Sequence, residues 1–429
     1  MSGAPTADAR PASLPLRRVA AVVVGNALEF YDFLTYAFFA VQIGQCFFPA
    51  STPGGQLLPS LAVFGAGFLT RPLGAVVIGG LADRIGRRPA MLLSFTLMGV
   101  AIAGLVLTPP FRTIGVAAPI LVIAWRLLQG FALGGEVGPT TAYLVEAAPP
   151  HRRGFYASLQ YMTQDLSVLA AGLVGVGLAD VLSPQALTDW GWRAAMAVGV
   201  IVVPIGVAVR RNLPETLFET GPDAAPAPGG IGPHLPAIGI GLLALAGAGI
   251  ANYTLDYLTT YAATTLHMRA GLALGATVVL GVFGTLSDPV GGLLSDRFGR
   301  KRVMMIPWAM LCLAAIPTFV VITRVHSAAA LYGGAALLQV LLALSAPAVL
   351  IAVTETLPRH VRAGAVALAY ALALSVFGGA TQFMIRWLIQ LTRDPLVPAY
   401  YLTGFAVLSL IAMAALKESA PARASAKRE

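Results

Sequence analysis

The sequence contains few charged residues and almost no cysteine. Asp, Glu, Lys and Arg make up only 11% of its 429 residues, whereas 57% are hydrophobic. A soluble domain carries roughly 25% charged residues, so this chain has too little polar surface to cover its apolar residues in water. The two cysteines, Cys46 and Cys312, fall in or beside apolar segments and match no disulfide framework or metal-ligand spacing. We expect both to be small packing residues.

Several functional signatures are also missing. The sequence has no nucleophile–base–orienter set, no paired histidines for a metal and no phosphate-binding loop, so we expect neither an enzyme nor a bound cofactor or metal. The net charge of +9 could suggest a nucleic-acid partner, but the basic residues form short clusters between apolar segments, as membrane topology requires. No short apolar region with a cleavage site precedes the first long apolar segment, so we expect no cleaved signal peptide.

The chain has instead a succession of apolar segments long enough to cross a bilayer. Backbone polar groups in lipid must be hydrogen-bonded within their own segment, so each segment is predicted to be a helix. The segments number twelve and lie near residues 19–48, 57–82, 89–108, 114–143, 154–181, 192–211, 236–262, 270–294, 303–323, 328–353, 363–391 and 397–416.

An internal repeat divides the twelve segments into six plus six. "GGLADRIGRR" at 79–88 returns as "GGLLSDRFGRKR" at 291–302, and "EAAPPHRRG" at 146–154 returns as "ETLPRHVRAG" at 355–364. The repeat therefore predicts two copies of one six-helix unit, with a shared site between them near the membrane midplane.

Other features of the chain agree with this division. Gln129 and Gln339 stand 210 residues apart, close to the offsets of 213 and 209 in the two repeated loops. We predict an all-α polytopic membrane protein with twelve transmembrane helices in two pseudo-symmetric six-helix bundles. Its parts are a cytoplasmic N-terminal tail at 1–18, an N-terminal bundle at 19–211, a Pro- and Gly-rich cytoplasmic loop at 212–235, a C-terminal bundle at 236–416 and a cytoplasmic C-terminal tail at 417–429.

Lys and Arg are distributed unevenly between the two sides of these segments. With both termini inside, the inner loops and tails hold 20 of them and the outer loops hold five. Cytoplasmic loops of membrane proteins carry the excess of basic residues. We therefore predict a multi-pass protein of a bacterial-type inner membrane with both termini in the cytoplasm.

The repeated loops match a known signature. The pattern Gly-x-x-x-Asp-Arg-x-Gly-Arg-Arg occurs at 79–88 and returns from Gly292 to Arg300. "RLLQG" at 126–130 and the Glu-x6-Arg spacing at 146–153 and 355–362 are two further motifs. In these motifs, across both halves, the chain resembles the major facilitator superfamily.

Other stretches resemble one branch of that superfamily. "GNALEFYDF", "FLTRPLGAVVIGGLADRIGRR", "GGEVG" and "VFGGATQFMIRWLIQLTRDPLVPAYY" are similar to the metabolite–proton symporters, which carry citrate, tricarballylate, 2-oxoglutarate, shikimate and proline or betaine. The resemblance implies solute uptake that is driven by the proton gradient and needs no other cofactor.

Charged residues of the inner loops are expected to form a cytoplasmic gate. Asp83 can face the N–H groups at the start of the next helix, which favour an anion, and nearby Arg and Glu residues can complete a network between helices. Such a network is a two-state element that forms and breaks; plain topology charge would explain the arginines but not Asp83 or Glu146. The predicted gate residues are Asp83, Arg84, Arg87, Glu136, Glu146, Arg153, Asp296, Arg297, Arg300, Glu355 and Arg362.

Charged residues also fall deep within the predicted helices, where each costs about 2.5–3.5 kcal/mol on insertion scales and needs a partner or a function. Six are acids and three are bases, namely Glu29, Asp32, Arg71, Arg126, Glu136, Asp165, Asp256, Asp288 and Arg386. A carboxylate without a partner in a low dielectric keeps a proton more readily than in water. The excess of acids is therefore typical of a proton-coupled carrier.

The first helix carries two of these acids. Glu29 and Asp32 are roughly 60° apart around the helix and about 4.5 Å apart along it. Asp32 and Arg126 both fall near mid-membrane, and the arrangement resembles the first-helix Asp and fourth-helix Arg of proton-driven sugar carriers in the superfamily. We predict that protonation of Asp32 frees Arg126 to bind a substrate carboxylate; the alternative is a static structural pair. Glu29 is expected either to pair with Arg71 or to hydrogen-bond near Asn26, as a coupling or a structural residue.

Polar residues of the other helices are candidate solute contacts. Asn252 and Asp256 share one stripe of the seventh helix, beside a row of tyrosines for which aromatic packing is the alternative. Arg386 is either a specificity residue or a snorkelling residue near the outer end, and Asp288 before Pro289 is a further candidate. The predicted contacts are Arg71, Arg126, Gln129, Gln160, Gln164, Asn252, Asp256, Tyr257, Gln339, Gln382 and Arg386.

The three intramembrane arginines favour an anionic solute, and we predict a monomeric proton-coupled symporter that imports a small organic acid, such as the di- or tricarboxylate citrate, by alternating access. Its expected partners are this solute, protons and the lipid bilayer. A proline- or betaine-type osmolyte held by aromatic faces and a shikimate-like acid are alternatives. Drug–proton antiport would suit the acidic excess, and a non-transporting sensor would need an added signalling domain.

Overall fold

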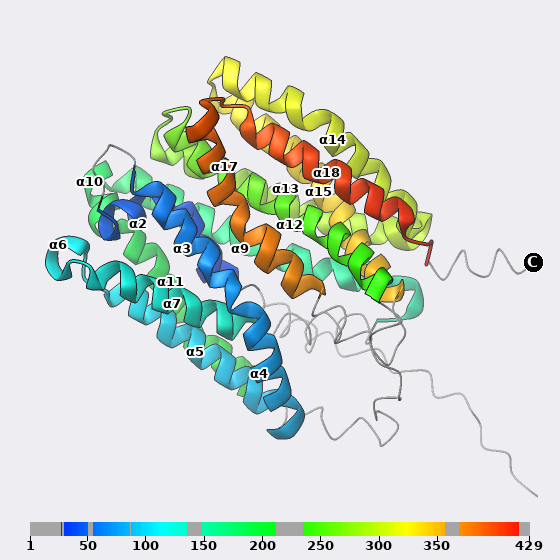
Figure 1. The fold of residues 1–429 in the computed structure, drawn as a ribbon, viewed down its shortest axis with the longest axis horizontal. Coiled ribbons are helices and arrows are strands. Elements are labelled where there is room, and N and C mark those ends of the chain that lie inside the picture. Colours follow the sequence, from blue (N-terminus) through cyan, green and yellow to red (C-terminus); the bar gives the residue numbers. More distant parts are fainter. Residues whose placement is uncertain are drawn as a thin grey trace, which may run out of the picture.

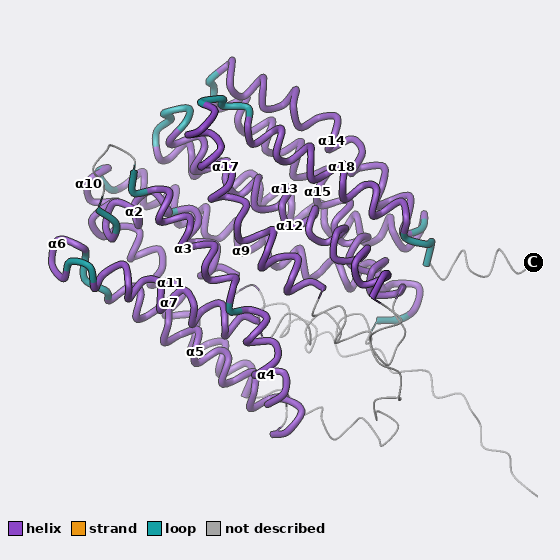
Figure 2. Tube along the Cα trace, in the orientation of Figure 1, coloured by secondary structure: helices purple, strands orange, loops and turns teal. Residues whose placement is uncertain are grey.

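A computed structural model describes residues 27, 30–49, 55–85, 87–134, 148–211, 235–356 and 369–419. Within these ranges the regular elements are all helices, joined by short loops (Figure 2). The first half contains helical residues 30–38, α2 (Ala40–Phe47), α3 (Leu57–Leu69), α4 (Arg71–Ile85), α5 (Arg87–Leu107), α6 (Phe111–Ile114), α7 (Ala117–Gly134), α9 (Arg153–Val181), α10 (Pro184–Ala186), η2 (Leu187–Gly191) and α11 (Trp192–Arg211). The second half contains α12 (Leu235–Thr264), α13 (Ala270–Phe298), α14 (Arg300–Val325), α15 (Ala328–Thr356), η5 (Ala373–Gly378), α17 (Gly379–Thr392) and α18 (Val397–Ala415).

Each predicted apolar segment coincides with helical residues of the described part. Nine of the described helices are long and apolar enough to cross a membrane. The other segments correspond to residues 30–47, to α5 and to α11. The second segment, predicted as one helix, is divided at Thr70 into α3 and α4. The break follows from Pro72, which has no N–H to bond the carbonyl group of Phe68.

The two halves lie side by side along most of their length (Figure 1). α9 of the first half packs along α13 of the second, and α3 packs against α17 and η5. Glycines allow some of this close approach: a Cβ on Gly65 would lie 2.6 Å from the carbonyl oxygen of Gly379. We call the α9–α13 contact the seam.

Apolar side chains cover the outside of the bundle as well as its interior. Large hydrophobic residues such as Val76, Leu313 and Ile411 are exposed, which suits a surface that faces lipid. The interior of the first half is rich in aromatic rings, with Phe33 stacked edge-on against Phe68. The fold is therefore that of a polytopic helical membrane protein.

Candidate functional site

Two arginines from neighbouring helices meet in the interior of the first half. Arg71 is the first residue of α4, and Arg126 lies within α7. The backbone of α7 lies directly against those of α3 and α4. A Cβ on Gly130 of α7 would collide with the carbonyl oxygen of Gly67 in α3, and a Cβ on Gly134 would collide with that of Arg71 in α4. Small residues permit such close packing of membrane helices, and here they bring the two arginines to the same region.

Both guanidinium groups lie over one aromatic ring. The guanidinium carbon of Arg71 is 4.4 Å from the ring centroid of Phe33 and 4.0 Å from that of Phe68. That of Arg126 is 4.3 Å from Phe33 and 4.5 Å from Tyr36. These distances are within the range of cation–π attraction. We call the two arginines and these rings the arginine cage.

No described acid forms an ion pair with the cations of the cage. Arg71 is 3% exposed and Arg126 is 0% exposed. Arg126 donates to the side-chain oxygen of Gln129 at 2.7 Å and to the carbonyl oxygen of Phe64 at 3.5 Å, but Nε of Arg126 and both Nε and Nη2 of Arg71 have no hydrogen-bond partner. Among the described residues neither arginine forms an ion pair; Glu29, the predicted partner of Arg71, lies outside them. A buried cation without a partner is costly, so the cage is suited to receive an anion.

Residues of the second half approach Arg71 from the other side. The ring of Tyr253 on α12 stacks edge-on against Phe68 at 5.2 Å, and both Tyr253 and Tyr370 interact electrostatically with Arg71. Gln164 on α9 donates to the Tyr370 hydroxyl at 3.4 Å. The cage is therefore in contact with both halves of the molecule.

Further predicted contacts lie on α12 and α17. Gln382 donates to the backbone carbonyl of Tyr253 at 3.5 Å, and its side-chain oxygen has no hydrogen-bond partner. Asn252 donates to Oδ2 of buried Asp256 at 3.2 Å. Gln160 is buried on α9. Asp256 interacts electrostatically with Asp165 of the first half, and Tyr253 stacks on Phe68 of the first half, so this part of α12 lies at the interface of the two halves.

Arg386 points inward rather than only toward the membrane surface. It is half-buried and interacts with the hydroxyl of Tyr257, which is fully buried on α12. Its Nε has no hydrogen-bond partner. The position favours a contact residue over a purely snorkelling one.

Asp32 does not occupy the place that the sequence predicts. The expected pair with Arg126 is absent: Asp32 is 2% exposed, and its carboxylate lies against the backbone of Gly199 on α11, so closely that a Cβ there would collide with it. Arg126 contacts Phe33 and Tyr36, which share one face of the first helix. Tyr36 lies one helical turn after Asp32, so the two residues share a side of the helix; the Asp32 carboxylate is kept from Arg126 because it is directed toward Gly199 of α11.

A second polar cluster lies in the seam. Oδ2 of Asp165 on α9 accepts a hydrogen bond of 2.8 Å from the amide of Gln339 on α15. The carboxyl group of Asp165 lies over Gly284, where a Cβ would collide with it, and within hydrogen-bonding reach of Asp288 one turn further along α13. Asp256 also interacts electrostatically with Asp165. Gln339, predicted as a solute contact, is thus engaged by an acid of the other half.

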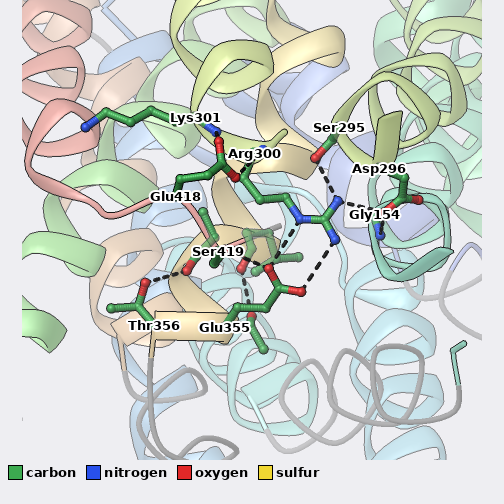
Figure 3. Close-up of polar contacts among 12 residues, drawn as sticks. Gly154, Ser295, Asp296, Arg300, Lys301, Glu355, Thr356, Glu418 and Ser419 are labelled. Atoms are coloured by element: carbon green, nitrogen blue, oxygen red, sulfur yellow. Dashed lines mark hydrogen bonds and ion pairs between the residues drawn. The ribbon is translucent and has the colours of Figure 1, made fainter. Parts of the chain in front are cut away.

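A charge network lies where α13 ends and α14 begins in the second half (Figure 3). Arg300 at the start of α14 donates to Asp296 at 2.7 Å and to Glu355 at 3.2 Å, and also to the hydroxyl of Ser295 at 3.1 Å. Arg300 is fully buried. The structure therefore brings together three of the predicted gate residues.

Asp296 connects this network to the first half. Its two carboxylate oxygens accept hydrogen bonds of 2.9 Å from the backbone N–H groups of Gly154 and Phe155 at the start of α9. The acid of the repeated loop motif was predicted, for Asp83, to face the next helix of its own half, whereas Asp296 faces a helix of the other half. An anion at a helix N-terminus is favourable in either case.

The C-terminal segment supplies the anion at the start of α14, the helix that follows Asp296. Glu418 accepts hydrogen bonds from the backbone N–H groups of Arg300 at 2.8 Å and Lys301 at 3.1 Å, and Ser419 donates to Glu355 at 2.7 Å. No sequence pattern indicated these contacts; the available signal was the acidic side chain of Glu418 shortly after the last helix. These contacts hold the end of the described chain against Arg300 and Glu355.

The other predicted gate residues are not part of this network as described. Arg297 is exposed and stacks on Phe298, because it lies about 100° around the helix from Asp296. Arg153 is half-buried, and its Nε has no hydrogen-bond partner. The side chains of six others lie outside the described part: Asp83, Arg84, Arg87, Glu136, Glu146 and Arg362.

The aromatic part of the cage was not anticipated. Phe33, Phe68 and Tyr36 lie against the two arginines, although only the arginines of this group were predicted from the sequence. The available signal was the density of aromatic residues in 30–39, "FYDFLTYAFF", around a buried acid.

Comparisons with known proteins agree with this architecture. The family model described as "Major Facilitator Superfamily" matches residues 33–369. A citrate-proton symporter of Klebsiella pneumoniae is 36% identical over 91% of this chain and 89% of its own length. An alpha-ketoglutarate permease of Escherichia coli is 34% identical over 95% of both chains, and a proline/betaine transporter of Escherichia coli is 32% identical over 94% of this chain and 84% of its own.

Solved structures show the same fold. A crystal structure of a D-xylose-proton symporter superposes with a TM-score of 0.75 at 17% identity, over 95% of this chain and 98% of the other. At that identity the likeness concerns the fold alone. Family model, relatives and fold lead to one conclusion: the chain belongs to the Major Facilitator Superfamily and is a multi-pass membrane transporter, not an enzyme.

Proposed function

We propose that the chain is a proton-coupled symporter that imports a small organic acid, with a di- or tricarboxylate such as citrate as the solute. The observation that carries this proposal is the arginine cage, which buries two cations without a carboxylate partner among the described residues. The citrate-proton symporter and the alpha-ketoglutarate permease among the relatives support the same solute class.

The geometry of the cage suits an anion with more than one carboxylate. The guanidinium carbons of Arg71 and Arg126 each lie within 4.4 Å of the Phe33 ring centroid, so two carboxylates of one small molecule can reach both. Arginine binds carboxylates through paired N–H groups, and three guanidinium nitrogens are without a partner here. Neutral hydrogen-bonding groups lie near these nitrogens, namely the side chains of Gln164, Gln382, Tyr253 and Tyr370.

The same contacts argue against a quaternary ammonium solute at this place. The faces of Phe33 and Phe68 are already occupied by guanidinium groups, and a second cation would be repelled there. A betaine-type solute would have to use other aromatic faces, together with Asp256. The proline/betaine relative makes this the alternative to test.

Asp32 is the proposed proton carrier of the first half. It is buried, and its Oδ1 has no hydrogen-bond partner. The carboxylate of Asp32 lies against Gly199 of α11 and not against Arg126. Any coupling between Asp32 and the cage therefore has to pass through movement of the first helix, to which Phe33 also belongs. Glu29 stays a candidate for the same role.

The remaining predictions complete the proposal. Both termini are cytoplasmic, the membrane is of the bacterial inner type, and one chain suffices for transport. The bundles span residues 19–211 and 236–416, and the network of Asp296, Arg300 and Glu355 acts as the inner gate, since it lies at the end of the seam and joins both halves.

The test is solute-triggered proton influx into proteoliposomes. The panel contains citrate, tricarballylate, succinate, 2-oxoglutarate, shikimate, proline and betaine, with Asp32→Asn and Arg126→Ala beside the wild type. We expect influx with di- or tricarboxylates that both variants lose. Influx with proline or betaine alone would contradict the solute class, and full influx in Asp32→Asn would contradict the role of that acid. If the whole panel is silent, cationic drugs and an antiport assay follow.

A further inference from the structure

The seam contains a pair of acids that the cage does not use. Asp165 of α9 and Asp288 of α13 come from different halves of the molecule, and their carboxyl groups lie within hydrogen-bonding reach. The close approach depends on Gly284, one turn before Asp288, since any Cβ there would collide with the Asp165 carboxyl group. The two acids are therefore pressed together by the packing of the halves.

No cation compensates this pair within the described part. The groups that face it are the Gln339 amide of α15, which donates to Asp165, the carboxyl group of Asp256 on α12, and the hydroxyl of Tyr161 on α9. All described ion pairs involve Arg300 at the start of α14 instead. Asp288 is 1% exposed, and its Oδ2 has no hydrogen-bond partner.

Two carboxyl groups in contact cannot both be ionised in such surroundings. One proton between them removes the repulsion and supplies the hydrogen bond that neither carboxylate can donate alone. We propose that Asp165 and Asp288 form a shared-proton pair across the seam, and that transport moves this proton together with the solute.

The link to movement follows from where the pair lies. Release breaks the O–H bond of the protonated carboxyl group, leaves two carboxylates, and passes the proton to water. The pair then carries two negative charges instead of one, next to Asp256, so the packing of α9 on α13 at Gly284 becomes unfavourable. Uptake of a proton restores it. Occupancy by a proton is thus tied to the contact between the halves, the two-state element that alternating access needs.

The first arm of the test needs no solute. Infrared difference spectra of the purified protein between acid and alkaline pH report the C=O stretch of protonated carboxyl groups. We expect Asp165→Asn and Asp288→Asn each to remove the same band, because an amide can donate to the remaining carboxylate without a proton. Asp288→Glu is expected to keep a band, which guards against loss by misfolding. Asp180→Asn is the matched control, since this acid is exposed at the outer end of the same seam.

The second arm measures coupling and rests on the proposed function. In proteoliposomes, citrate exchange at equal pH needs no net proton movement, whereas accumulation driven by a gradient does. A difference of about one pH unit can sustain about a tenfold citrate gradient per coupled proton. We expect Asp288→Asn to keep exchange and to lose accumulation, while Asp180→Asn keeps both.

The outcomes are distinct. If both seam variants keep the wild-type carboxyl band, there is no shared proton and the proposal is wrong. If the band is lost but Asp288→Asn still accumulates citrate as the wild type does, the proton is structural and its coupling to transport is refuted. If the wild type neither exchanges nor accumulates citrate, the solute proposal fails, and the infrared arm still decides whether the pair holds a proton.

Discussion

Arg126 and Arg300 are both fully buried, yet their surroundings are opposite. Arg300 is held by the carboxylates of Asp296 and Glu355 at 2.7 and 3.2 Å. Arg126 has an amide oxygen and aromatic rings around it but no carboxylate among the described residues. The positive charge of Arg300 is neutralised by two carboxylates of the protein, whereas that of Arg126 can still pair with the carboxylate of a bound solute. A buried arginine that is fully paired indicates a structural or gating role, and an unpaired one indicates a ligand.

The pseudo-equivalent glutamines show the same division. Gln129 accepts a hydrogen bond from Arg126 at 2.7 Å, whereas Gln339 donates one to Asp165 at 2.8 Å. An amide can do either, so one residue type serves a cation in the first half and an acid at the seam. The two halves have similar folds, but their equivalent glutamines bind partners of opposite charge.

The largest difference between Arg126 and Arg300 is expected in the free energy of unfolding when each is replaced by an apolar residue. Arg300→Met leaves two carboxylates unpaired, and breaking a buried pair costs about 3–5 kcal/mol. Arg126→Met removes an uncompensated charge and should leave the free energy of unfolding unchanged or raise it. Chemical unfolding in detergent measures both. Arg297→Met is the control, because Arg297 follows Asp296 in the chain but is exposed. Its free energy of unfolding should stay within about 0.5 kcal/mol of the wild type. Equal losses in Arg126→Met and Arg300→Met would remove the distinction.

The same substitution at the two glutamines should act in opposite directions. Gln129→Glu gives Arg126 a permanent carboxylate, so the protein should gain about 1 kcal/mol of stability and lose affinity for citrate. Gln339→Glu adds a third acid beside Asp165 and Asp288 and should cost about 1–3 kcal/mol at neutral pH. That cost should shrink at acid pH, where the new carboxyl group takes up a proton. Unfolding at both pH values tests this; stabilisation by Gln339→Glu would contradict the arrangement of the seam.

The shared ring of the cage can be tested by Phe33→Leu. Without this ring the two guanidinium groups are no longer held in place for the solute, and we expect the binding free energy of citrate to weaken by about 1–2 kcal/mol. The affinity for citrate should therefore fall about tenfold. Phe30→Leu is a matched control on the same helix, as Phe30 is equally buried and no described guanidinium group lies over its ring. Isothermal titration compares the two. If both variants bind alike, Phe33 does not position the arginines.

The smallest effect is expected at the C-terminal contact. Glu418→Gln keeps the shape of the side chain but removes the charge at the N-terminus of α14, which is worth about 0.3–1 kcal/mol. Unfolding at low and high salt should show this loss and its screening. A loss that does not depend on salt would point to packing rather than charge.

The fold was readable from the sequence because its signals are long and repeated. Apolar length and the two loop motifs act over whole helices, and tertiary contacts do not override them. The helix break at Thr70 was less visible, although Pro72 marks it.

The candidate site was readable in its charged residues and in part of its polar residues, but not in its phenylalanines. Arg71, Arg126 and Asp165 stand out because a charge in an apolar helix needs a reason. Which residues they meet depends on the direction of each side chain within the bundle, and the Asp32 carboxylate is directed toward Gly199 of α11 rather than toward Arg126. The contact of Asp165 with Asp288 joins two halves of the chain, and no local pattern in the sequence predicts the register of that seam.

The most direct test of the account is the citrate-dependent unfolding of the wild type and Arg126→Met in the same detergent. A ligand that binds only the folded state stabilises it by about 2.7 kcal/mol at about 100 times its dissociation constant. We predict that citrate stabilises the wild type, and that Arg126→Met is at least as stable without citrate but does not respond to it. An equal response of both proteins would contradict the claim that the unpaired arginine holds the solute.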